Sequence, residues 1–173
     1  HAENRRRLAE RMRAHGAAAR GVVLLQGGEA LFRYDTDTEE HFKQESFFKW
    51  AFGVKEPGFF GAVEVGSGKG WLFMPRLPAE WAVWQGRIHP PAHFQAMYEV
   101  DEVRYVDELA PVLAGLDAAP LYLLKGRNTD SGNWAARRCA SVFWSSGTDA
   151  ASCLCRAAKS TGTRVSSGAS GAS

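Results

Sequence analysis

Short apolar runs alternate with stretches of helical periodicity along most of the chain, and this alternation predicts the secondary structure. Strands are expected where apolar runs rich in β-branched or aromatic residues lie between turn formers. These runs cover residues 21–26, 30–34, 59–65, 71–74, 103–106 and 121–124. Helices are expected where apolar positions recur every three to four residues, or where proline opens the run. These stretches cover residues 3–13, 78–84, 90–97 and 107–116.

The first and last predicted helices carry additional signals. In the first, Leu8 and Met12 lie four residues apart on one face, and the arginines are expected to cover the other face. In the last, Asp107 is expected to cap the N-terminus, because a carboxylate accepts hydrogen bonds from the free backbone N–H groups there.

An aromatic cluster occupies residues 45–52, which include Phe47, Phe48, Trp50 and Phe52. This density of aromatic side chains indicates a short buried element, and the pattern leaves open whether it is a helix or a strand. A turn is expected next at Glu56-Pro57-Gly58. Beyond it, the glycine-rich residues 66–70 are expected to join two strands as a β-hairpin.

Strands that alternate with helices predict an α/β fold, a single domain with a mixed central sheet flanked by helices. The hairpin argues against an all-parallel sheet, because a short turn joins antiparallel strands, whereas parallel strands require long crossovers. After residue 132 the composition changes to Ser, Ala, Gly, Thr and Arg. We therefore expect a folded domain over residues 1–132 and an atypical, at most partly ordered tail over 133–173, in which residues 142–144 could add one short strand.

The net charge of +2 is unevenly distributed. Residues 1–20 and 133–173 are each basic, with a net charge of +4, so residues 21–132 carry −6. An acidic body argues against a nucleic-acid-binding face on the folded core. No apolar run is long enough to span a bilayer, and no signal peptide is recognisable, so no membrane partner is expected. The three cysteines all follow residue 138, which favours a reducing, cytoplasmic setting over a disulfide scaffold.

Three motifs offer candidate chemistry, and each has a plainer interpretation. Residues 66–70 (GSGKG) resemble a phosphate loop, but Lys69 is followed by a strand, which favours a hairpin turn. His89 and His93 have the spacing of helical metal ligands, but two prolines separate them, which favours a surface role. Cys153 and Cys155, with Cys139, lack a complete zinc-site spacing and are expected to be thiols in a loose tail.

The order and spacing of many fragments resemble the N-terminal domain of the prolidase family. Prolidases are Xaa-Pro dipeptidases within the aminopeptidase P and creatinase superfamily. The resemblance runs nearly without gaps from about residue 4 to residue 132 and is strongest in 44–78. The matching fragments are residues 22–29, 33–34, 36–38, 44–54, 56–58, 72–73, 75–79, 84, 86, 88–89, 93–94, 100–101, 105–108 and 128–132.

The resemblance implies an α/β domain that precedes a larger catalytic domain with two metal ions, usually manganese, held by two Asp, one His and two Glu. It further implies that this N-terminal domain serves dimerisation and shapes the substrate site for proline-containing dipeptides. The expected partner is a second copy or a full-length prolidase subunit. Trp84 matches a family residue that walls the substrate site, while a core or interface aromatic remains the alternative.

The chain departs from the family after residue 132. Residues 133–173 contain no Glu, no His and a single Asp, Asp149, so they cannot supply the metal ligands. We therefore expect no catalytic residue and no metal bound by this chain, and no hydrolysis of Xaa-Pro dipeptides by it alone. The composition of the tail suggests a frameshifted, mis-spliced or truncated product, a hypothesis that comparison of the coding frames tests. The alternative function is a free-standing interaction protein with a prolidase-type N-terminal fold.

Overall fold

The computed structural model describes residues 1–116, 118 and 120–124, and the expected tail lies outside these residues. Five strands form one mixed sheet in the order β4-β3-β2-β1-β5. The strands are β1 (Val22–Gln26), β2 (Phe60–Glu64), β3 (Gly70–Met74), β4 (Glu102–Tyr105) and β5 (Leu121–Leu123). The central pairs β1–β2 and β2–β3 are antiparallel, and the outer pairs β1–β5 and β3–β4 are parallel. The predicted α/β fold with a mixed sheet and its central hairpin is confirmed.

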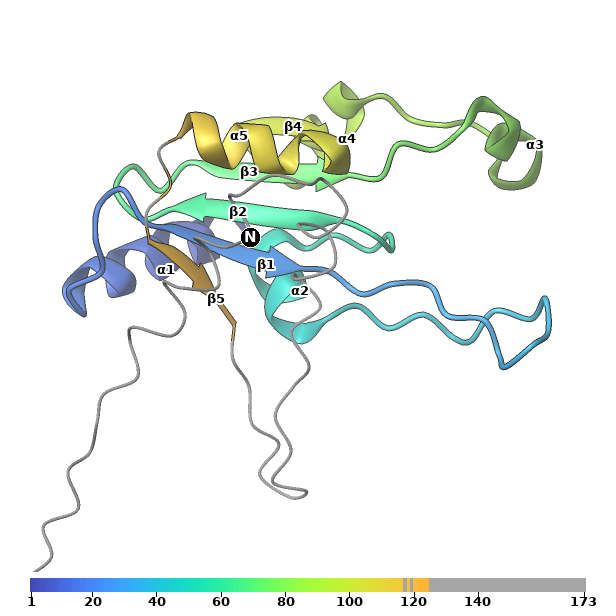
Figure 1. Cartoon of the computed structure of the whole chain (residues 1–173), viewed down its shortest axis with the longest axis horizontal. Coiled ribbons are helices and arrows are strands. Elements are labelled where there is room, and N and C mark those ends of the chain that lie inside the picture. Colours follow the sequence, from blue (N-terminus) through green and yellow to red (C-terminus); the bar gives the residue numbers. More distant parts are fainter. Residues whose placement is uncertain (117, 119, 125–173) are drawn as a thin grey trace, which may run out of the picture.

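Helices cover both faces of this sheet, as Figure 1 shows. The chain forms α1 (Ala2–Ala14), α2 (Ser46–Phe52), α3 (Ala82–Gln85), α4 (Pro91–Tyr98) and α5 (Leu109–Gly115). Two short 3₁₀ helices, η1 (Ala79–Trp81) and η2 (Val106–Glu108), precede α3 and α5.

Alternation along the strands divides the core into two layers. In β1, Val23 and Leu25 join the layer beneath α1, α2 and α4, while Val22 and Leu24 join the layer beneath α5. Because helices cover both faces, the central strands are apolar at nearly every position rather than at every second one. The largest wholly buried side chains include Phe48 and Phe52 on one side and Phe73 on the other.

The aromatic cluster forms a helix, α2, rather than a strand, and capping residues define both of its ends. The carboxylate of Glu45 accepts hydrogen bonds from the backbone N–H groups of Phe47 and Phe48 at 3.1 and 2.7 Å. Gly53 ends the helix in the left-handed region, with φ of 74°. The helix then buries Phe48 and Phe52 completely and leaves Phe47 more than half exposed.

Three sequence predictions about local structure are wrong. Residues 30–34 form no strand: they meet residues 38–40 only through an isolated bridge between Phe32 and Glu39. Asp107 does not cap α5, which has no side-chain cap: the carboxylate of Asp107 accepts from Arg76 instead, at 3.1 Å. Arg5 lies on the buried face of α1, with 3% of its surface exposed, rather than on the solvent side.

Two long connections project from the same end of the sheet (Figure 1). The first arm, residues 27–45, follows β1, and the second arm, residues 75–90, follows β3. Both β1 and β3 are antiparallel to β2, so the two arms leave the carboxyl ends of strands that run in one direction. The fold therefore presents two separate extended segments at one end of the sheet.

Candidate functional site

The second arm contains the residue that the sequence comparison with prolidases singled out. Trp84 lies in α3, and its side chain falls outside what the structure describes. Its neighbours on the arm are open to solvent, with Trp81 exposed to 44% and Val83 to 82%. The arm thus carries large apolar side chains away from the core, where they are available to a partner surface.

A guanidinium clamp fixes the base of this arm. Arg76 donates to both carboxylate oxygens of Asp107, from Nε at 3.1 Å and from Nη2 at 3.4 Å. The same guanidinium lies 3.7 Å from the ring centroid of Tyr105, in a cation–π contact. These contacts join the start of the arm to the end of β4 and to η2, so the arm that carries α3 is anchored where it leaves the sheet.

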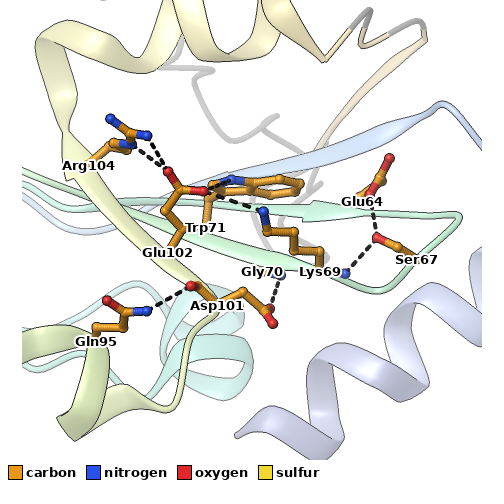
Figure 2. A network of polar contacts seen from close by, with 9 residues as sticks. All are labelled: Glu64, Ser67, Lys69, Gly70, Trp71, Gln95, Asp101, Glu102 and Arg104. Atoms are coloured by element: carbon orange, nitrogen blue, oxygen red, sulfur yellow. Dashed lines mark hydrogen bonds and ion pairs between the residues drawn. The ribbon is translucent and has the colours of Figure 1, made fainter. Parts of the chain in front are cut away.

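A polar network connects the β2–β3 hairpin with β4, and Figure 2 shows its members. Glu102 is the centre: one carboxylate oxygen accepts from Nε of Arg104 at 2.6 Å, and the other accepts from the indole of Trp71 at 3.3 Å and from Lys69 at 3.4 Å. The hydrogen bond from Arg104 is the main reason that the pKa of Glu102 lies below its ordinary value, and burial opposes it.

A second set of contacts ties the neighbouring residues of the same hairpin to β4. The carboxylate of Asp101 accepts the backbone N–H of Gly70 at 2.7 Å, while Gln95 donates to the backbone carbonyl of Asp101 at 2.8 Å (Figure 2). Ser67 donates to Glu64 and accepts the N–H of Lys69 at 3.0 Å. Each residue of this network makes at least one hydrogen bond within it, which is the arrangement of a structural network.

The glycine-rich residues 66–70 form the turn of that hairpin, as the sequence predicted. They join two antiparallel strands, whereas a phosphate loop joins a strand to a helix. The ammonium of Lys69 pairs with Glu102 and lies 4.8 Å from the ring of Trp71. The phosphate-loop interpretation is therefore wrong for this segment.

His89 and His93 meet, but not in the geometry of metal ligands. Their rings stack at a centroid distance of 3.9 Å and an interplanar angle of 14°, and His93 lies edge-on to Phe94. Stacked rings present their faces to each other, so their nitrogens do not converge on one ion. Across residues 1–116, 118 and 120–124, no three His, Cys, Asp or Glu side chains gather as a metal site would require. The described residues thus do not fit a manganese pair.

Tyr98 makes a tertiary hydrogen bond that the sequence analysis missed. Its hydroxyl donates to Glu56 at 2.6 Å, and this bond joins α4 to the Glu56-Pro57-Gly58 turn. Burial and the hydrogen bond to Glu56 together raise the pKa of Tyr98 to about 12. Tyr98 and Glu56 are 42 residues apart, so no local sequence pattern could indicate that they pair.

The remaining candidates concern the tail and the membrane. Cys139, Cys153 and Cys155 lie outside the described residues. In the part of the chain that the structure describes, no helix has the length and apolar character needed to cross a bilayer.

Comparison with known proteins is consistent with this geometry. Residues 1–122 match the family described as "Aminopeptidase P, N-terminal domain". The chain is 54% identical to the Xaa-Pro dipeptidases of Rattus norvegicus and Homo sapiens over 131 residues, which is 75% of this chain and 27% of each of those proteins. It therefore spans about a quarter of the length of these relatives.

Solved structures share the fold at lower identity. The aminopeptidase PepP of Pseudomonas aeruginosa matches with a TM-score of 0.59 and 20% identity, over 76% of this chain and 30% of that one. An aminopeptidase P of Escherichia coli carrying the His361Ala change matches with a TM-score of 0.60 and 19% identity, over 75% of this chain and 29% of that one. The family match over residues 1–122 and the 54% identity to Xaa-Pro dipeptidases show that this chain belongs to the aminopeptidase P N-terminal domain family.

Proposed function

We propose that residues 1–132 form the non-catalytic N-terminal domain of a manganese-dependent Xaa-Pro dipeptidase, with residues 133–173 a separate tail. The observation that carries the proposal is the 54% identity over 131 residues to proteins named Xaa-Pro dipeptidase. In this role the domain shapes the substrate site and contributes to self-association or to pairing with a full-length subunit. The catalysis belongs to another part of the enzyme.

The second arm is the element proposed to act on the substrate site. It leaves the sheet at an anchored base, where Arg76 clamps Asp107, and it carries Trp84 within α3. An aromatic face packs well against the apolar ring of a proline residue, because both present flat or near-flat hydrocarbon surface. Trp84 is accordingly proposed as a substrate-wall residue, and Trp81 on the same arm is its natural comparison.

The metal of the proposed enzyme belongs outside the described residues. They bring no three candidate ligands together, and residues 133–173 contain no Glu and no His. Manganese, when bound in the full enzyme, would activate the attacking water. This chain's own contribution is to exclude water from the substrate and to orient it. We accordingly propose that the chain alone does not hydrolyse Xaa-Pro dipeptides.

A chimaeric enzyme tests the proposal. The 131 matched residues of the human Xaa-Pro dipeptidase are replaced by those of this chain, and hydrolysis of Gly-Pro is measured with manganese. The chimaera should be active. Trp84→Ala should lower kcat/KM about tenfold, equivalent to about 1.4 kcal/mol of lost contact energy. Trp84→Phe should recover most of the loss, and Trp81→Ala should change kcat/KM less than threefold, or about 0.6 kcal/mol.

The outcomes separate the domain proposal from the residue proposal. A folded chimaera without activity contradicts the role of the domain. An active chimaera that tolerates Trp84→Ala contradicts only the substrate-wall role, and leaves Trp84 as an interface aromatic.

Light scattering of the purified chain addresses self-association. A defined and stable oligomer favours the alternative, a free-standing interaction protein. A monomer or weak dimer, with the apolar side chains of the arms left exposed, favours a domain of a larger enzyme.

A further inference from the structure

A cavity of about 730 Å³ opens at the base of the first arm, between that arm, α2 and the chain that follows α2. Its apolar wall is made by Phe42, Trp50 and Val54. Its volume lies within the range of about 300–1,000 Å³ that is usual for small-molecule sites. The cavity is remote in sequence from Trp84 and from the polar network of the β2–β3 hairpin, so neither of those features explains it.

The charged lining of this cavity is entirely basic. Lys43, Lys49 and Lys55 line it, and they are three of only four lysines in residues 1–124. The other polar residues of the lining are His1, His41, Gln44 and Ser46, so no carboxylate is among them. Because residues 21–132 carry a net charge of −6, this concentration of lysine runs against the composition of the surrounding chain.

The three lysine side chains are solvent-exposed, and none lies within ion-pair distance of a carboxylate among the described residues. None of them forms an ion pair there, whereas the fourth lysine, Lys69, pairs with Glu102. The two carboxylates that are nearest in sequence are already engaged. Glu45 caps α2 through two backbone N–H groups, and Glu56 accepts the hydroxyl of Tyr98. These carboxylates keep their charge, but none of them forms an ion pair with a lysine of the cavity.

Like charges that line one cavity repel one another, although solvent screens the repulsion between exposed groups. A bound anion removes that cost and adds charge-assisted hydrogen bonds, for which lysine is a common donor to phosphate. Several ammonium groups around one cavity favour a ligand with several negative groups, and the wall of Phe42 and Trp50 favours a flat apolar part beside them. We propose that this cavity binds a small molecule that carries several phosphate or carboxylate groups next to a flat apolar part.

Thermal unfolding of the purified chain gives the first test. Tripolyphosphate, citrate and metal-free ATP serve as probes, each compared with sodium chloride at equal ionic strength. At about five times its dissociation constant, a bound probe should raise Tm by about 4 °C. A larger rise in Tm with tripolyphosphate than with citrate indicates phosphate recognition, and the reverse indicates carboxylate recognition. A larger rise with ATP than with tripolyphosphate shows that the apolar wall contributes to binding.

Two triple variants of equal charge locate the effect. Lys43→Gln, Lys49→Gln and Lys55→Gln together should abolish the rise in Tm and should leave the unliganded Tm unchanged or higher, because the repulsion is relieved. The matched control replaces three exposed arginines outside the cavity, Arg7, Arg11 and Arg87, by Gln, and it should keep the full rise. A rise that survives in the lysine variant, or one that is lost equally in the control, overturns the proposal. So does the absence of a rise with all three probes.

Chemical-shift changes measured by nuclear magnetic resonance on the wild-type chain give a second test, which does not depend on whether the variants fold. Amide shifts should cluster at residues 41–55, and ATP should also shift the Trp50 indole N–H. Shifts that map instead to the arginines of α1 or to the basic residues 133–173 would show diffuse electrostatic binding and would overturn the assignment.

Discussion

Replacing Arg5 by Met probes how α1 is attached to the sheet. The guanidinium is buried and donates from Nη1 to the carbonyl of Ala51 at 3.1 Å and from Nη2 to the carbonyl of Glu99. It also lies 5.3 Å from the ring centroid of Phe52. One side chain thus joins α1 to the end of α2 and to the turn after α4.

The expected loss follows from these contacts. Each hydrogen bond from a charged donor contributes about 1.5–3 kcal/mol, and the cation–π contact about 0.5–2 kcal/mol. Desolvation opposes them by on the order of several kcal/mol, and the same burial lowers the pKa of Arg5. Met fills most of the volume but leaves two carbonyls without their donor, so we expect a net loss of about 3 kcal/mol in the free energy of unfolding.

Urea denaturation followed by circular dichroism measures this loss, with Arg7→Met as the control. Arg7 is exposed on the same helix, and its replacement should change the free energy of unfolding by less than about 0.5 kcal/mol. If Arg5→Met were as stable as the wild type, or more stable, the desolvation cost would outweigh the contacts. The attachment of α1 would then be apolar packing alone.

Three further changes test other parts of the fold by the same urea assay. Glu45→Ala removes the cap of α2, whose carboxylate accepts two N–H groups at 3.1 and 2.7 Å, and should cost about 1 kcal/mol; no loss would show that the cap is not needed. Gly61→Ala places a Cβ 2.2 Å from the ring of Phe52 and should cost about 1–3 kcal/mol; a neutral result would mean that the ring moves freely. Because the pKa of Tyr98 is raised to about 12, its contribution is complete below about pH 10 and is lost as the pH rises towards 12. Tyr98→Phe should remove that part of the alkaline decline, and an unchanged pH profile would contradict the role of the bond to Glu56.

The central strands could be predicted because their patterns are local. In residues 59–65 and 71–74, apolar runs flank five residues rich in glycine, and a hairpin satisfies both the burial and the turn. The alternation of strand and helix predicted a mixed sheet, but not which strands pair in parallel. These features need no information about distant residues.

The failure at residues 30–34 has a topological cause. The segment has the composition of a strand, with Leu31, Phe32 and Tyr34, but these side chains are 48%, 56% and 93% exposed. A strand requires a neighbour in a sheet, and β2 and β5 already occupy both sides of β1. The segment instead pairs with residues 38–40 of the same arm, through backbone hydrogen bonds between residues 31 and 40 and between residues 33 and 38. Composition alone could not reveal that this segment extends away from the sheet instead of joining it.

Contacts between distant residues account for the other differences. Arg5 repeats the charge pattern of its exposed neighbours, and its burial depends on carbonyls 46 and 94 residues away. Asp107 is a residue type that commonly caps helices, but Arg76 of the second arm donates a hydrogen bond to its carboxylate. The lysines of the cavity are spaced six residues apart, a period that matches neither helix nor strand, so only the fold brings them together.

The most direct test of the account is whether the purified chain hydrolyses Gly-Pro in the presence of manganese. The described residues bring together no metal-ligand set, and the tail contributes a single Asp and no Glu or His. We therefore predict a rate equal to that of buffer with manganese alone, together with no manganese retained after dialysis. Hydrolysis above that background, abolished by chelation and restored by manganese, would contradict the central claim that this chain is a supporting domain rather than the catalyst.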